Sequence, residues 1–133
     1  MFKMINFRAK SYRLIVIALG LFLAAITYWP VPYQDIRLVS YSFFLSWFFG
    51  AFIIGFLSGA FFRNPTIISS LLVLSGFILA VLLRIIYDGI SNPSSHNLAG
   101  IELFITGLYV FPAALLGSIL GNFLNKSRIL KKS

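Results

Sequence analysis

Four long apolar segments constrain the fold of this chain more than any other feature. They cover residues 14–29, 39–62, 66–87 and 101–124, and none of them contains more than one charged residue. A helix of about 20 apolar residues crosses the hydrocarbon core of a bilayer, because each residue adds about 1.5 Å. The sequence therefore predicts an all-α, polytopic membrane protein, with four transmembrane helices in an antiparallel bundle and a single domain over residues 1–133.

The composition indicates that the solvent of these segments is lipid. Hydrophobic residues make up 59% of the chain and charged residues 11%, whereas soluble domains carry about 25% charged residues. The net charge of +8 does not indicate nucleic-acid binding, because the basic residues lie in short flanks next to apolar runs. We therefore expect the lipid bilayer, and anionic lipid headgroups on the basic side, as partners, and no nucleic acid.

The basic residues are distributed unequally between the two sides of the predicted bundle. Nine lie on the side of the two termini, and two, Arg37 and Arg84, lie on the other side. The nine are Lys3, Arg8, Lys10, Arg13, Arg63, Lys126, Arg128, Lys131 and Lys132. Because short cytoplasmic segments carry an excess of Lys and Arg, we expect a multi-pass protein of a cell inner membrane with both termini in the cytoplasm.

Small residues recur at intervals of four in two of the predicted helices. In the second segment, a spacing of four connects Ser42, Ser46 and Gly50, and then Ala51, Gly55 and Gly59. In the fourth segment it connects Ala113, Gly117 and Gly121. Helices in lipid associate through close packing at small residues rather than through the hydrophobic effect. We favour packing of the two stripes on each other, and a contact between two copies of the chain is the alternative.

The three acidic residues of the chain and its single histidine gather on the side opposite the termini; they are Asp35, Asp88, Glu102 and His96. Arg84 and Asp88 are four residues apart, so they share a helix face and are expected to pair. Glu102 falls in the first turn of the fourth segment, where the helix dipole favours a carboxylate. The candidate ligand or ion site consists of Arg84, Asp88, His96, Asn97 and Glu102.

Three interpretations of this polar group remain open. In the first, which we favour, Arg84 and Asp88 anchor the third helix, while Glu102 and either His96 or Asn97 stabilise the start of the fourth. In the second, the group binds a cation, a proton or a polar ligand. In the third, Asp88, His96 and Glu102 act as acid, base or metal ligands of an enzyme. One histidine with two carboxylates has no recognisable metal-ligand spacing, so we predict no metal and no cofactor.

The segment from Asp88 to Leu98, followed by Glu102, resembles a loop of small uncharacterised bacterial four-helix inner-membrane proteins. That loop reads approximately D-P-T-S-H-N-L-W-P-F-E, and the resemblance covers about one tenth of the chain. The matching positions are Pro93, Ser95, His96, Asn97, Leu98 and Glu102, whereas Ala99, Gly100 and Ile101 replace Trp, Pro and Phe of the pattern. The resemblance implies a bacterial inner-membrane protein with four helices, and it implies no biochemical activity.

These features predict a small integral membrane protein that acts as a structural or accessory subunit, either docked on a partner in a larger membrane complex or as a homo-oligomer. The alternative is a small transporter or channel subunit with a polar vestibule formed by Asp35, Arg84, Asp88, His96 and Glu102. Against this alternative, the centres of the four segments contain no ionisable residue that could relay ions or protons. A membrane enzyme is the third and least favoured function, so no catalytic residue is assigned.

Overall fold

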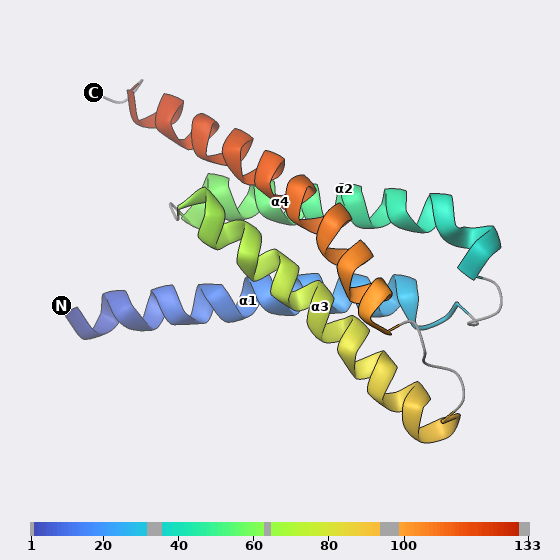
Figure 1. Cartoon of the computed structure of the whole chain (residues 1–133). Coiled ribbons are helices and arrows are strands. Elements are labelled where there is room, and N and C mark those ends of the chain that lie inside the picture. Colours follow the sequence, from blue (N-terminus) through green and yellow to red (C-terminus); the bar gives the residue numbers. More distant parts are fainter. Residues whose placement is uncertain (1, 32–35, 63–64, 94–98, 131–133) are drawn as a thin grey trace.

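The computed structural model describes the backbone of residues 2–31, 36–62, 65–93 and 99–130, and the side chains of residues 11–31, 44–62, 65–93, 99–127 and 130. The described residues form four helices (Figure 1): α1 (Phe2–Tyr28), α2 (Ile36–Phe62), α3 (Thr66–Ser91) and α4 (Ala99–Leu130). All four are long and apolar enough to cross a membrane. The all-α class and the four apolar helices are therefore as the sequence predicts, and the helices extend beyond the apolar segments.

Prolines set three of the helix boundaries. Pro30 lies two residues beyond Tyr28, the last residue of α1, and Pro65 precedes α3 with an extended backbone, φ −52° and ψ 134°. At the other end of α3, Asn92 is also extended, and its N–H donates to the carbonyl of Asp88 at 2.7 Å. Pro93 then prevents the helix from continuing, because proline has no N–H and restricts the residue before it.

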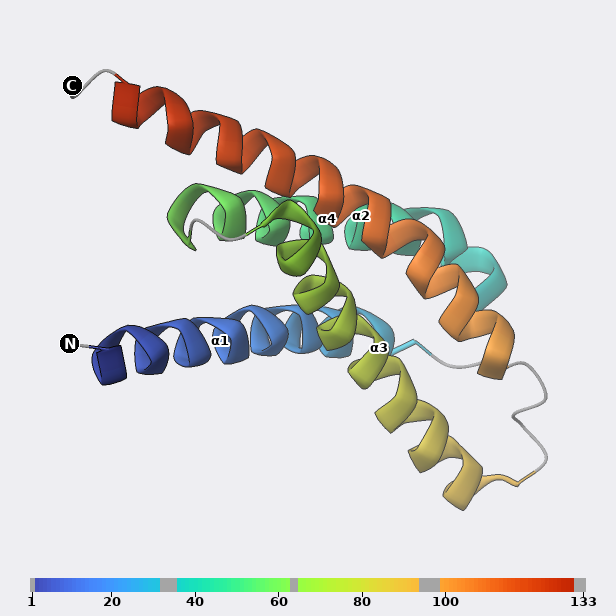
Figure 2. The same ribbon diagram turned by 60° about the vertical axis from the view of Figure 1, so that its left-hand side comes forward.

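The helix ends gather on two sides of the molecule. Figure 1 shows the first turn of α1 and the last turn of α4 on one side, together with the last turn of α2 and the first turn of α3. The last turns of α1 and α3 and the first turns of α2 and α4 lie toward the opposite side, as Figure 2 also shows. We call this opposite side the Arg84 end.

The helices contact one another unequally. The most extensive contact joins α2 to α4, followed by α1 to α3 and α3 to α4, whereas α2 and α3 share the least extensive one. Only three residues of the chain separate the end of α2 from the start of α3, yet the two helices diverge from this connection in Figure 2. The reason is that each of them packs its small residues on another helix, α2 on α4 and α3 on α1.

The contact between α2 and α4 is built on four of the glycines singled out in the sequence. Gly55 and Gly59 of α2 lie against Ala114 and Ser118 of α4, and Gly117 and Gly121 of α4 lie against Phe52 and Phe56 of α2. A Cβ added at Gly59 would lie 2.5 Å from the Ser118 carbonyl oxygen, far inside a normal contact. The two stripes therefore pack on each other within one chain.

Two other close contacts place α1. Gly50 faces the side chain of Leu23 on α1 rather than α4, so it does not belong to the α2–α4 contact. Gly20 of α1 and Gly76 of α3 face each other, and a Cβ at Gly20 would lie 3.4 Å from the Cα of Gly76. This pair was not predicted from the sequence, because each residue is the only glycine of its predicted segment.

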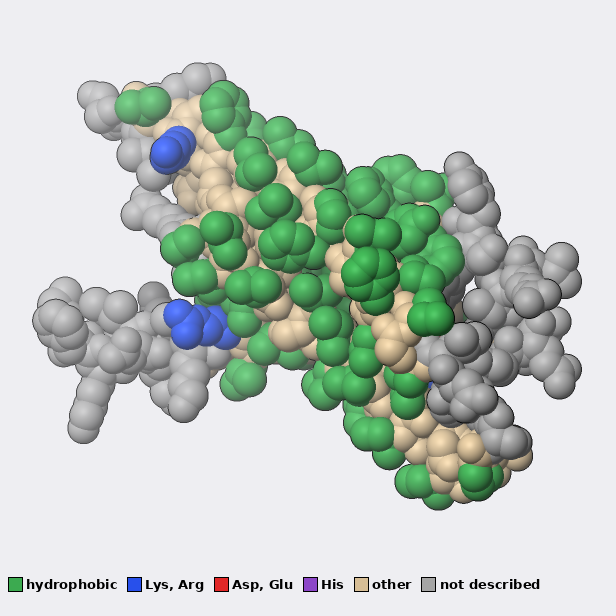
Figure 3. Space-filling view, in the orientation of Figure 1, with side chains coloured by type: hydrophobic (Ala, Val, Ile, Leu, Met, Phe, Trp, Pro, Cys, Tyr) green, Lys and Arg blue, Asp and Glu red, His purple; other side chains and the backbone are tan. Residues whose placement is uncertain are grey.

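The core contains small and branched side chains around four aromatic ones, Tyr12, Tyr28, Trp47 and Phe77. Trp47 is 1% exposed and makes edge-to-face contacts with Tyr28 and Phe77, with ring centroids 5.7 and 5.3 Å apart. Outside the core, large hydrophobic side chains such as Phe22, Phe61 and Phe104 are exposed. Figure 3 shows hydrophobic side chains covering the visible face between the two sides of the molecule. A surface of this kind suits a lipid solvent.

Candidate functional site

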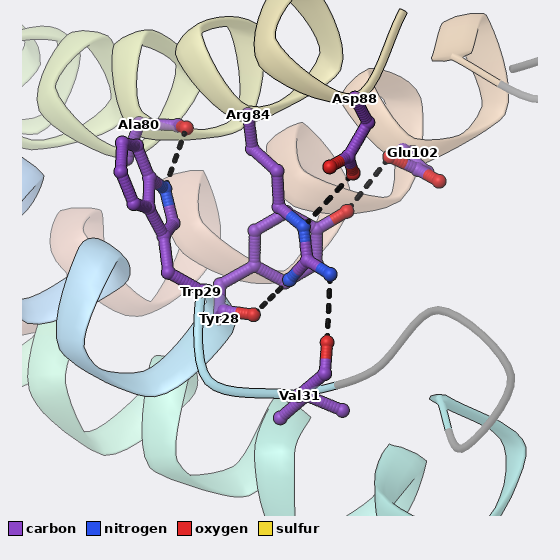
Figure 4. A network of polar contacts seen from close by, with 7 residues as sticks. All are labelled: Tyr28, Trp29, Val31, Ala80, Arg84, Asp88 and Glu102. Atoms are coloured by element: carbon purple, nitrogen blue, oxygen red, sulfur yellow. Dashed lines mark hydrogen bonds and ion pairs between the residues drawn. The ribbon is translucent and has the colours of Figure 1, made fainter. Parts of the chain in front are cut away.

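Arg84 is the centre of a polar network at the Arg84 end (Figure 4). Its side chain leaves α3 toward the end of α1 and is buried, with the residue 8% exposed. Nε donates to Asp88 Oδ2 at 3.2 Å, while the two terminal nitrogens donate to the carbonyl oxygens of Tyr28 and, at 2.6 Å, Val31. The last carbonyls of a helix lack intrahelical donors and carry partial negative charge. The guanidinium therefore satisfies carbonyls at and just beyond the end of α1.

Tyr28 extends this network to α4. The guanidinium carbon of Arg84 lies 4.4 Å from the centroid of the Tyr28 ring, which is a cation–π contact. The Tyr28 hydroxyl donates to Glu102 Oε2 at 2.7 Å, as Figure 4 shows. The chain of contacts thus runs from α3 through the end of α1 to the first turn of α4, and it ties together three helices at this end.

A cavity of about 100 Å³ lies beside Glu102, between residues of all four helices. It is lined by Tyr28, Phe44, Trp47, Val81, Glu102, Ile105 and Thr106, and we call it the Glu102 cavity. Two of the aromatic side chains that line it also contact residues outside the cavity. Trp47 Nε1 donates to Thr27 Oγ1 at 2.7 Å, and the Phe44 ring stacks on Tyr109 with centroids 4.8 Å apart. A second cavity of about 80 Å³ borders Trp29, Arg84, Tyr87 and Asp88.

The structure brings together three of the five predicted site residues. Arg84 and Asp88 form the predicted ion pair, and Glu102 lies in the first turn of α4 as expected. His96 and Asn97 lie outside the described residues, as does Asp35. Within the described part of the chain, no three His, Cys, Asp or Glu residues are grouped so that they could hold a metal ion.

The aromatic residues of the site were missed by reasoning from the sequence. Tyr28 and Trp29 sit where a belt of interfacial aromatics is expected, so nothing marked Tyr28 as a partner of both Arg84 and Glu102. Phe44 and Trp47 belong to a segment rich in phenylalanine, in which Trp47 is the one described aromatic residue that is fully buried. The available signal was the hydrogen-bonding capacity of Trp47 and Tyr28, since a buried indole N–H or phenol hydroxyl needs a partner.

A second polar chain lies toward the opposite side of the molecule. Ser58 on α2 is within hydrogen-bond distance of Tyr12 on α1, at 3.2 Å, and donates to Ser69 on α3 at 3.0 Å. Asn122 of α4 donates to Thr66 of α3, also at 3.0 Å. These hydroxyl and amide contacts cross between helices, as polar side chains do in helical membrane proteins. They contain no charged group, so we assign them to the packing of the helices and not to a functional site.

Comparison of the chain with models of protein families, with curated proteins and with solved structures found no match. The resemblance of the segment that begins at Asp88 therefore remains a prediction. A fold alone does not define an activity, so the function has to be argued from the geometry at the Arg84 end.

Proposed function

We propose that this chain is a multi-pass protein of a bacterial inner membrane, with four helices that cross the bilayer as an antiparallel bundle and both termini in the cytoplasm. The four long apolar helices and the exposed hydrophobic side chains support insertion. Arg13 and Lys126, near the two termini, are exposed, and Figure 3 shows Lys and Arg side chains on that side. Arg84, on the opposite side, is buried and paired. The positive-inside rule favours cytoplasmic termini, because nine of the eleven Lys and Arg residues lie on the side of the termini.

The topology is tested with single cysteines, because the natural chain contains none. Ser91→Cys places a thiol at an exposed position of the Arg84 end, and Ser133→Cys places one at the C-terminus. A membrane-impermeant maleimide added to intact spheroplasts should label the first thiol, and the second only after lysis. Labelling of position 133 in intact spheroplasts would reverse the proposed orientation.

Within the membrane, we propose a structural or accessory role, exercised in a complex with a partner or with further copies of the chain. The observation that carries this proposal is the engagement of Arg84. Its guanidinium contacts Asp88, two carbonyls at the end of α1 and the Tyr28 ring, and Tyr28 in turn contacts Glu102. A buried charge whose contacts join three helices holds those helices in place, which is the role expected of a structural residue.

The accessory role is tested by isolating the natural protein in a mild detergent. We expect it to migrate above the size of a protein–detergent monomer, and crosslinking in intact membranes should yield the same assembly. A chain that remains monomeric in native membranes as well as in detergent would contradict the proposal.

A transporter or channel subunit is the second candidate, and the cavity beside Glu102 is the observation that favours it. The test compares solute and ion flux in proteoliposomes for the natural protein, Asp88→Asn and His96→Ala. Flux that these substitutions abolish would replace the accessory role with transport. An enzyme, the least favoured function, would be excluded if a triple alanine variant at Asp88, His96 and Glu102 kept full cellular function.

A further inference from the structure

We propose that the Glu102 cavity binds an organic ammonium group, supplied by an amine solute or by the head group of a phospholipid. This site goes beyond the accessory role and does not depend on it. Three aromatic side chains, Tyr28, Phe44 and Trp47, line the cavity together with one carboxylate. Aromatic faces beside a carboxylate are the combination that recognises methylated ammonium groups in proteins, because the ring faces and the carboxylate all carry negative potential.

The size of the cavity suits such a group. An apolar protein cavity of about 150 Å³ takes up benzene, whereas the Glu102 cavity measures about 100 Å³. By proportion, it accommodates about four heavy atoms, which is close to the size of a methylated ammonium group. A flat ring or a larger head group would enter only in part.

The charges around the cavity favour a cation. Arg84 and Asp88 neutralise each other in an ion pair, so the described charges at this end, Arg84, Asp88 and Glu102, sum to −1. Among the side chains that the structure describes, Glu102 has no cationic partner, and its recorded side-chain contact is the Tyr28 hydroxyl. Glu102 is half-buried beside this apolar cavity, and partial removal of a carboxylate from water is unfavourable unless the group is paired. A bound ammonium group would supply the positive charge that pairs with Glu102.

Other occupants fit the same cavity less well. A hydrocarbon chain would fill the volume but would leave the Glu102 carboxylate desolvated, and an anion would be repelled by it. A metal ion such as Ca²⁺ requires six or more oxygen ligands. The cavity offers fewer, because only Tyr28, Glu102 and Thr106 among its lining residues carry side-chain oxygens.

The test uses Trp47 as an internal reporter. The full chain carries Trp29→Phe, which leaves Trp47 as its only tryptophan, and is placed in nanodiscs of phosphatidylglycerol, a lipid without an ammonium group. Choline and its uncharged carbon isostere, dimethylbutanol, are titrated while the fluorescence of Trp47 is recorded. We expect choline to give a saturable change, and the isostere to bind at least about tenfold more weakly, because it lacks the charge that meets Glu102 and the rings.

Matched variants separate the site from the surrounding fold. Glu102→Gln keeps an acceptor for Tyr28 but removes the charge, and we expect the dissociation constant of choline to rise about tenfold. Phe44→Leu removes one aromatic wall and should raise it about threefold. The control Phe104→Leu makes the same exchange at a residue that is 70% exposed and outside the cavity, so it should leave the affinity unchanged. Helical circular dichroism and Trp47 emission without ligand verify that each variant is folded.

The two sources of the ammonium group are distinguished by changing the lipid. In nanodiscs of phosphatidylethanolamine, a head group in the cavity would compete with choline and weaken its apparent affinity, whereas an unchanged affinity identifies a solute site. Both results support the proposal. It is overturned if choline gives no saturable response in phosphatidylglycerol, if dimethylbutanol binds as tightly as choline, or if folded Glu102→Gln keeps the natural affinity.

Discussion

Gly117→Ala is the sharpest perturbation of the contact between α2 and α4. The added Cβ would point at the backbone of α2, where its nearest neighbours are the carbonyl oxygen of Phe52 and the amide nitrogen of Phe56. Backbone atoms of a helix cannot rotate aside as the end of a flexible side chain can. The two helices must therefore separate or slide, and the dispersion contacts along the whole interface become weaker.

The expected loss in the free energy of unfolding follows from the distance between the added Cβ and the amide nitrogen of Phe56. The Cβ would lie 2.9 Å from that nitrogen, whereas ordinary contacts begin at 3.4 Å, so the helices must part by at least 0.5 Å, which is 3.4 − 2.9. A gap of about 0.5 Å forfeits roughly a quarter of the dispersion energy of each atom pair that it affects. Overpacking of this kind lowers the free energy of unfolding by about 2 kcal/mol, which is about a thirtyfold change in the ratio of folded to unfolded protein.

The matched control is Gly107→Ala on the same helix. A Cβ at Gly107 would meet no atom within 4 Å, so this variant gains the helix propensity of alanine without the clash. The propensity gain cancels when the two variants are compared, and the difference in the free energy of unfolding isolates the contact. Unfolding by dodecyl sulfate in mixed micelles, followed through the buried Trp47, measures it. Equal stability of the two variants would refute the assigned contact between α2 and α4.

Three further predictions use the same unfolding assay. Arg84→Lys should lower the free energy of unfolding by about 2 kcal/mol, because an ammonium group cannot reproduce the planar set of contacts that the guanidinium makes. A variant as stable as the natural protein would contradict the proposed role of the Arg84 network. Tyr28→Phe should cost about 1 kcal/mol by removing the hydrogen bond to Glu102, and this cost should vanish in a Glu102→Ala background, which offers the hydroxyl no side-chain acceptor. Ser58→Ala should cost about 1 kcal/mol, whereas Ser75→Ala, at an exposed serine that bonds within its own helix, should be neutral.

The helices could be predicted from the sequence because their signal is local. A long apolar run bounded by proline defines a candidate spanning helix without reference to any other part of the chain. The pairing of helices depends on residues far apart in the sequence, and only one of the two glycine contacts was predicted. The regular stripes ending at Gly59 and Gly121 indicated the α2–α4 contact, whereas the α1–α3 contact depends on Gly20 and Gly76, each the only glycine of its predicted segment.

The same distinction explains what could be predicted of the site. The pair of Arg84 and Asp88 follows from a spacing of four residues on one helix, and the placement of Glu102 follows from its position in a helix start. The role of Tyr28 depends on three helices meeting at one point, with Arg84 56 residues away and Glu102 74 residues away along the chain. Such convergence cannot be read from one sequence, so the aromatic half of the site appears only in three dimensions.

The position of Tyr28 links the network to the Glu102 cavity. Its ring lies beneath the Arg84 guanidinium, its hydroxyl holds Glu102, and its side chain also lines the cavity. A ligand that binds only when Tyr28 and Glu102 are in these positions stabilises the arrangement by mass action. Occupancy of the cavity would therefore tighten the junction of α1, α3 and α4, and an accessory protein with this site would present a more rigid Arg84 end to its partner when the ammonium group is bound.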